Sequence, residues 1–210
     1  MDLRKEKSWI ILLTILFLAG YLFHRILITR PLVMEITDIF LFLSNFTVLW
    51  FVFKKDASAE LIIWSGLVFL LTLIIEITGV QTGLIFGQYT YGNTLNVKIN
   101  GVPLIIALNW TVLIMATFSL GKWISRSWIL APIIGSLLIV AFDFVLEPVA
   151  IKLDYWEWEK GNIPMQNYFA WFVISLFFSS FLSILKVDLD SKILKYFFLI
   201  QLLFFLLFKI

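Results

Sequence analysis

The sequence predicts an all-α, polytopic integral membrane protein in which seven transmembrane helices form one bundle. Hydrophobic residues make up 61% of the 210 residues, and the mean hydropathy is +1.00. Soluble domains are nearer to half apolar, so the excess is expected to face lipid. Seven apolar runs are each close to the roughly 20 residues that a helix needs to cross a bilayer. We therefore expect a single transmembrane domain over residues 1–210, without a separate soluble domain.

The expected spans cover residues 8–26, 36–53, 59–80, 102–121, 128–149, 168–186 and 193–209. The first run follows a basic stretch, as in a signal peptide, but six further runs follow and no A-x-A cleavage site is evident, so we interpret it as a span. Ten Lys and Arg residues lie on the side of the N-terminus and six on the other. The positive-inside rule then places the N-terminus in the cytoplasm and the C-terminus outside the cell membrane.

Composition excludes several kinds of chemistry. The chain has no Cys and one His, which excludes disulfides, thiol nucleophiles, Cys-type zinc sites and the His clusters of membrane di-iron oxygenases. Motifs for magnesium diphosphate, a nucleophile elbow and a P-loop are absent from the sequence. A net charge of +2 gives no reason to expect nucleic acid binding. We expect no metal and no cofactor, and the lipid bilayer as the surroundings.

Three carboxylates interrupt the apolar spans: Glu76 in the third, and Asp143 and Glu147 in the fifth. An acid at mid-bilayer costs about 2.5–3.5 kcal/mol on insertion scales, so such residues are candidates for function. The two spans run in the same direction, which places all three acids near one side of the membrane. The alternative for Glu76 is a side chain that extends to the interface.

Asp143 and Glu147 are four residues apart and therefore share one helix face. Two close carboxyls in a low dielectric cannot easily both ionise, so one is expected to remain a neutral acid. Pro148 is expected to kink or end the helix beside them. The alternative is an interfacial pair neutralised by Lys152 or Lys160.

Aromatic and amide side chains accompany the acids. Loops 81–101 and 150–167 open on the side of the acids and carry glycines and aromatic rings, which would also suit a belt at the membrane interface. Amides can orient a water and tryptophan faces can stabilise a cation, although each residue alone could serve helix packing. The expected substrate-binding residues are Tyr89, Tyr91, Asn109, Trp110, Trp156, Trp158, Asn167 and Trp171.

The order and spacing of these residues resemble the membrane carotenoid 1,2-hydratase family, which includes the bisanhydrobacterioruberin hydratases. The resemblance covers residues 76–171, and the first two spans and the last do not share it. Its motifs here are Glu76-x-x-Gly79, Phe86-Gly87-x-Tyr89-x-Tyr91, Asn109-Trp110, Asp143-x-x-x-Glu147-Pro148, Trp156-x-Trp158 and Gln166-Asn167-Tyr168-x-x-Trp171. Glu147 stands where many members of the family have a second Asp, which lengthens the acid by one methylene.

The resemblance implies a cofactor-independent hydro-lyase of carotenoid biosynthesis. Such an enzyme adds water across the terminal 1,2 double bond of an acyclic carotenoid such as lycopene, by acid catalysis through a tertiary carbocation. Asp143 lies deeper than Glu147, so we expect it to donate the proton, with Glu76 holding the water and Glu147 tuning the pair. The carotenoid is the expected partner, with a homo-oligomer or other carotenoid enzymes as further partners. The alternatives are a membrane carotene cyclase, a transporter and a structural subunit.

Overall fold

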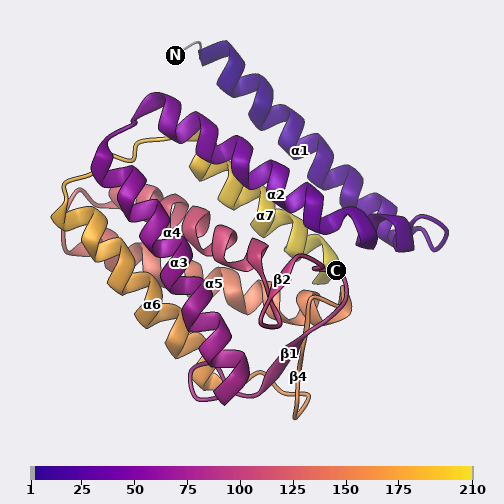
Figure 1. The fold of residues 1–210 in the computed structure, drawn as a ribbon. Helices are drawn as coiled ribbons and strands as arrows, with labels where there is room; N and C mark the ends of the chain where they lie inside the picture. Colours follow the sequence, from indigo (N-terminus) through magenta and orange to yellow (C-terminus); the bar gives the residue numbers. More distant parts are fainter. Residues whose placement is uncertain (1–2, 210) are drawn as a thin grey trace.

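The computed structural model describes residues 3–209 and consists mainly of seven helices (Figure 1). They are α1 (Leu3–Arg25), α2 (Arg30–Lys55), α3 (Ala59–Thr82), α4 (Leu104–Ile124), α5 (Leu130–Lys152), α6 (Met165–Ile184) and α7 (Lys192–Lys209). All seven predicted helices are present, and α2 begins six residues before the predicted start at residue 36. Six of them, α1 to α6, are long and apolar enough to cross a membrane among the described residues. The helix α7 falls outside that group, because its 18 residues include three lysines.

The centre of the bundle is α4, which carries an unbroken buried stretch over residues 110–119. It packs against α5, α3, α7 and α2, while α1 lies along the edge of the bundle beside α2 and α7 (Figure 1). The helices α4 and α5 approach closely because glycines face the opposing backbone. A Cβ on Gly121 would lie 2.2 Å from the Ala131 carbonyl oxygen, and a Cβ on Gly135 would lie 3.0 Å from the Thr117 carbonyl oxygen. Small residues at such crossings are typical of membrane bundles.

The contact at Gly121 gives a stability prediction. We expect Gly121→Ala to destabilise the protein by about 1–3 kcal/mol, because the added methyl meets backbone that cannot move aside. Gly66 in α3 provides the control, since a Cβ there meets nothing within 4 Å. The measurement is the midpoint of thermal unfolding in detergent for both variants. Equal midpoints for Gly121→Ala and Gly66→Ala would contradict this account of the α4–α5 contact.

The loops that the sequence left irregular contain four short strands. Strand β1 (Tyr89–Tyr91) pairs antiparallel with β4 (Trp156–Trp158), which joins the α3–α4 connection to the α5–α6 connection (Figure 1). Tyr89 stands opposite Trp158 and Tyr91 opposite Trp156. Strands β2 (Lys98–Ile99) and β3 (Val102–Pro103) form a second small ribbon before α4. These ribbons are an addition to the predicted all-helical fold.

Pro148 lies inside α5 and does not end it, so one of the two expected outcomes is wrong: the helix continues to Lys152. Proline lacks an N–H, which leaves the carbonyl of the residue four positions earlier without its helical donor. That carbonyl belongs to Phe144, and the Lys209 Nζ donates to it at 3.1 Å. The same ammonium lies 4.8 Å from the centre of the Phe144 ring. The end of α7 is thereby fastened to α5 at the proline.

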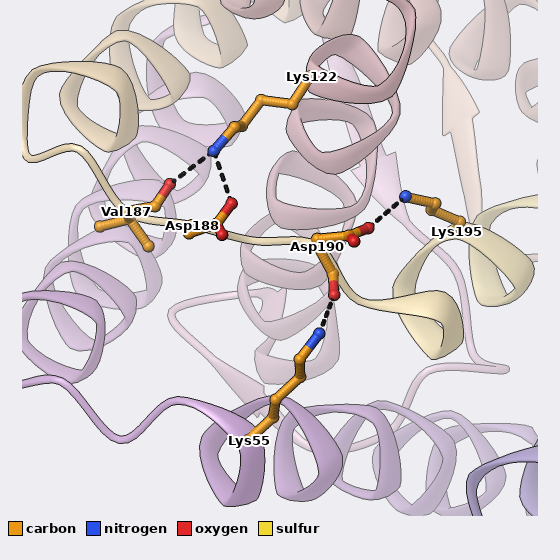
Figure 2. A network of polar contacts seen from close by, with 6 residues as sticks. All are labelled: Lys55, Lys122, Val187, Asp188, Asp190 and Lys195. Atoms are coloured by element: carbon orange, nitrogen blue, oxygen red, sulfur yellow. Dashed lines mark hydrogen bonds and ion pairs between the residues drawn. The ribbon is translucent and has the colours of Figure 1, made fainter. Parts of the chain in front are cut away.

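At the opposite end of the bundle, the α6–α7 connection is held by lysines from three helices (Figure 2). Lys122 of α4 forms an ion pair with Asp188 at 2.9 Å, and Lys195 of α7 forms one with Asp190 at 2.7 Å. Lys55 of α2 donates to the Asp190 carbonyl. The hydrogen bond from Lys195 and its charge lower the pKa of Asp190. Both aspartates are largely exposed, so each pair is worth only about 0–1 kcal/mol and serves to orient the connection.

Candidate active site

Glu76 is a buried carboxylate that accepts three hydrogen bonds. The Tyr89 and Tyr91 hydroxyls donate to its Oε2 at 2.6 and 2.8 Å, and the Trp110 Nε1 donates to its Oε1 at 2.8 Å. The side chain is 4% exposed, so the alternative of an acid extending to the interface is wrong. Gly79 lies three residues after Glu76 in α3 and leaves room for another side chain to approach closely. The Phe86 ring fills that space, 2.6 Å from where a Cβ of Gly79 would lie.

Glu147 is held in a similar way by three N–H groups. The Trp156 and Trp158 Nε1 atoms donate to its Oε2 at 3.0 and 2.8 Å, and the Asn167 Nδ2 donates to its Oε1 at 3.0 Å. Among the described residues, the ion pairs are those of Lys122 and Lys195 at the other end of the bundle. The alternative in which Lys152 or Lys160 neutralises this acid is therefore wrong.

The β1–β4 ribbon explains how two loops deliver four donors. Side chains alternate between the two faces of a strand, so the tyrosines of β1 and the tryptophans of β4 point to the acids while Thr90 and Glu157 are exposed. Burial and the charge of Glu76 raise the pKa values of Tyr89 and Tyr91 well above the usual range, so both remain protonated donors at neutral pH. The belt interpretation is wrong for these aromatic residues. The Tyr-x-Tyr and Trp-x-Trp alternation was the sequence signal for the ribbon.

Asp143 lies one helical turn before Glu147 on α5 and is completely buried. The Asn167 Nδ2 donates to its Oδ2 at 2.7 Å, so this one amide group bridges both acids of α5. The Asp143 Oδ1 has no hydrogen-bond partner among the described residues. Glu147 thus has both oxygens satisfied by donors, whereas Asp143 keeps one oxygen free.

One cavity of about 270 Å³ connects the acid end of the bundle with α1 and α2. Glu76 and Glu147 both line it, whereas Asp143 does not, so two of the three acids at this end of the bundle face the cavity. The remaining lining is mainly apolar and aromatic. All eight residues predicted to bind substrate are among the lining residues: Tyr89, Tyr91, Asn109, Trp110, Trp156, Trp158, Asn167 and Trp171.

Two features of the cavity wall bear on chemistry. The Trp110 and Trp171 rings are stacked, with centroids 4.1 Å apart and an interplanar angle of 28°. On the α4–α7 side, the Gln201 Nε2 lies 3.4 Å from the Asn109 Oδ1, which places two amides in the wall. Sequence reasoning missed Gln201 because α7 was interpreted as a generic apolar helix. Its signal was a single amide in the middle of an apolar run.

The site offers hydrogen-bonded acids rather than a cluster of metal ligands. Among the described residues, no three His, Asp or Glu side chains gather closely enough to hold a metal ion. Asp143 and Glu147 are bridged by an amide, and Glu76 is bound by donors of other elements. The arrangement can place acidic groups and water beside an apolar molecule.

Two comparisons with known proteins gave a match. The sequence profile of a family described as "Carotenoid biosynthesis protein" matches residues 36–209, which extends well beyond the motif-bearing residues 76–171. A bisanhydrobacterioruberin hydratase from Haloarcula japonica is 29% identical over 107 residues, covering 46% of this chain. The match spans 36% of that relative's own length. No solved structure matches the chain.

Proposed function

Because the chain belongs to the carotenoid biosynthesis protein family, we propose that it hydrates the terminal double bond of an acyclic carotenoid end. The observation that carries the proposal is the pair of buried acids, Glu76 and Glu147, which line one apolar cavity beside stacked tryptophans. The name of the matched relative, a hydratase, agrees with this reaction class. The proposed enzyme is a hydro-lyase that uses its own side chains as acid and base.

The reaction balances with one proton and one water. The terminal double bond of such an end is trisubstituted, with C1 bearing two methyl groups. A proton bonds to C2, and the positive charge develops on the tertiary C1. The oxygen of a water then bonds to C1 and releases its proton to a base, which leaves a tertiary alcohol. The acid is restored when a proton from that base or from surrounding water returns to it. The site must therefore supply a strong acid, a surface that tolerates a cation, and a base for the water.

We assign the proton transfer to Glu147. A general acid must reach the reacting atom, and Glu147 lines the cavity whereas Asp143 does not. Burial favours the protonated form of Glu147 before the transfer, and three N–H donors stabilise the carboxylate that is left after it. Asp143, which the sequence suggested as donor, becomes the positioning partner that keeps one proton on the pair. Its free Oδ1 can carry that proton at rest, and the proton passes to Glu147 before each transfer to the substrate.

The tryptophan stack and Glu76 complete the proposed mechanism. Aromatic faces attract cations, and the Trp110–Trp171 pair lies in the wall next to the acids, where it can stabilise the charge on C1. Glu76 is held as a carboxylate by three donors and can accept the proton of the attacking water. Asn109 and Gln201 supply amides that can orient this water.

The proposal places the protein in the cell membrane with its N-terminus in the cytoplasm and α7 as a seventh crossing helix. The excess of Lys and Arg at the end of the bundle that carries Lys55, Lys122 and Lys195 supports this orientation. A reporter enzyme that is active only outside the cytoplasm should be active when it is fused within the loop 81–101. A reporter that is active only in the cytoplasm should be inactive at the same position, and the opposite pattern would mean that the orientation is reversed.

The reaction class is tested with purified protein and lycopene, followed by mass spectrometry of the pigment. We expect a product that gains one water. An isomer of unchanged mass would instead identify a carotene cyclase, which makes the same cation but closes a ring. Unchanged lycopene, with the folded state checked by size-exclusion chromatography, would contradict any acid-catalysed role on this substrate.

A further inference from the structure

The cavity is too small for a whole carotenoid. Its volume is about 270 Å³, and an apolar cavity of about 150 Å³ accommodates one benzene ring, or six carbons. By that measure the cavity holds roughly ten carbons, which is two isoprene units, whereas a complete carotenoid of eight units would need roughly four times the space. The remaining polyene must therefore lie outside the cavity.

The cavity opens toward lipid between α1 and α2. Three side chains that line it, Leu16, Phe23 and Ile36, are also exposed on the outer surface of the bundle, at 42%, 47% and 47%. These three residues define the mouth. The two helices lie side by side in this region (Figure 1), and α1 buries the smallest share of its residues among the six candidate spans. The exposed surface of a span contacts acyl chains, so a molecule dissolved in the bilayer meets the mouth directly.

Between the mouth and the acids the wall is aromatic. Phe17 packs edge to face against Phe40 of α2 at 5.0 Å between ring centroids, and against Phe204 of α7 at 5.6 Å. All three rings line the cavity, and they lead from the mouth toward the wall that carries Gln201 and Asn109. Flat aromatic and aliphatic surfaces suit the planar, apolar chain of a polyene.

We infer that this protein takes its substrate laterally from the bilayer through the α1–α2 mouth and binds only one acyclic terminus, about two isoprene units deep. The polyene beyond those units stays between the helices and the lipid. The site therefore recognises the acyclic end and not the length of the chain. A substrate with two such ends is processed one end at a time, with release and reversal between the two hydrations. This inference rests on the proposed hydratase function.

Two variants test the mouth. Ile36→Trp places a bulky ring in the mouth, and Ile39→Trp places the same ring one turn along α2, on a side chain that is 60% exposed and does not line the cavity. We expect Ile36→Trp to lower the hydration rate by at least about tenfold, because the blocked substrate cannot reach the acids. Ile39→Trp should match the wild type. Equal hydration rates for the two variants would contradict entry of the substrate through the α1–α2 mouth.

A second measurement does not depend on turnover. Because the chain contains no Cys, the thiol of an Ile36→Cys or Ile39→Cys variant can be labelled selectively with a photoreactive benzophenone. Irradiation with radiolabelled lycopene in membranes should give a radioactive adduct at position 36. An excess of unlabelled lycopene should suppress this adduct. Labelling at position 39 should remain insensitive to that excess. If the excess of unlabelled lycopene suppresses the adducts at both positions equally, or fails to suppress the adduct at position 36, entry through this mouth would also be contradicted.

Substrate length separates this inference from the proposed function. Wild-type protein is given lycopene and an acyclic polyene two isoprene units shorter that has the same ends, each in detergent micelles. Similar hydration rates for the two are expected. If lycopene is hydrated but the shorter polyene is not, the site does not recognise the end alone. The proposed hydratase function would survive that result. Failure with both substrates would reject the hydratase, and this inference with it.

Discussion

Replacing Glu147 by glutamine is expected to lower carotenoid hydration by about 10²–10⁴-fold, the usual cost of removing a general acid. Glutamine retains the shape and one oxygen for the tryptophan N–H groups, so the fold and the β1–β4 ribbon should persist. The matched control is Glu157→Gln, because Glu157 lies between the two tryptophans on the same strand but is exposed. Near-normal turnover of Glu147→Gln on lycopene would contradict the assignment of proton transfer to this residue.

Asp143→Asn distinguishes the positioning partner from the donor. Without the second carboxyl, Glu147 loses the group that carries the proton of the pair at rest, so it must take its proton from the medium alone. Activity should therefore fall near neutral pH and recover partly as the pH is lowered. Glu147→Gln should stay inactive across the same range. If Asp143→Asn is equally inactive at every pH while Glu147→Gln retains activity, Asp143 is the donor, as the sequence alone suggested.

Replacing Glu76 by glutamine is expected to separate the two halves of the reaction. Hydration should fall on the order of 10²-fold or more, because the attacking water loses its base. Protonation by Glu147 should continue, and the cation should return its proton. In deuterated water, the Glu76→Gln variant should therefore exchange hydrogen at the substrate terminus without gaining water.

The control for this variant is Glu60→Gln, an exposed acid in the first turn of the same helix. It should hydrate lycopene as the wild type does. Loss of deuterium exchange together with hydration in Glu76→Gln would mean that Glu76 takes part in protonation. Unchanged hydration would remove it from the mechanism.

Most of the helical framework could be predicted from the sequence, because each hydrophobic run is long enough to form a span by itself. The location of the acids near one end of the bundle was also predictable, because helices two spans apart, such as the third and the fifth, run in the same direction. The spacing of Asp143 and Glu147 correctly placed both on one face of α5, where Asn167 bridges them. It could not tell which of the two reaches the cavity, because that depends on how α5 is rotated against α4 and α6.

The ribbon and α7 were less predictable. Strands of three residues have no stability of their own, and β1 and β4 form because distant loops meet above the acids and exchange backbone hydrogen bonds. Their alternating aromatic residues then satisfy Glu76 and Glu147 rather than a membrane interface. Similarly, the place of Gln201 in the cavity wall follows from the packing of α7 against α4, which brings its side chain to Asn109. Such pairings are tertiary, and short local patterns do not specify them.

The most direct test of the acid-catalysed hydration is the isotopic fate of lycopene incubated with the wild-type protein. In water enriched in heavy oxygen, the account predicts a product with one added water whose tertiary hydroxyl carries the label. In deuterated water it predicts one deuterium on the adjacent carbon, derived from Glu147. A product of unchanged mass, or a hydroxyl whose oxygen does not come from water, would contradict the account.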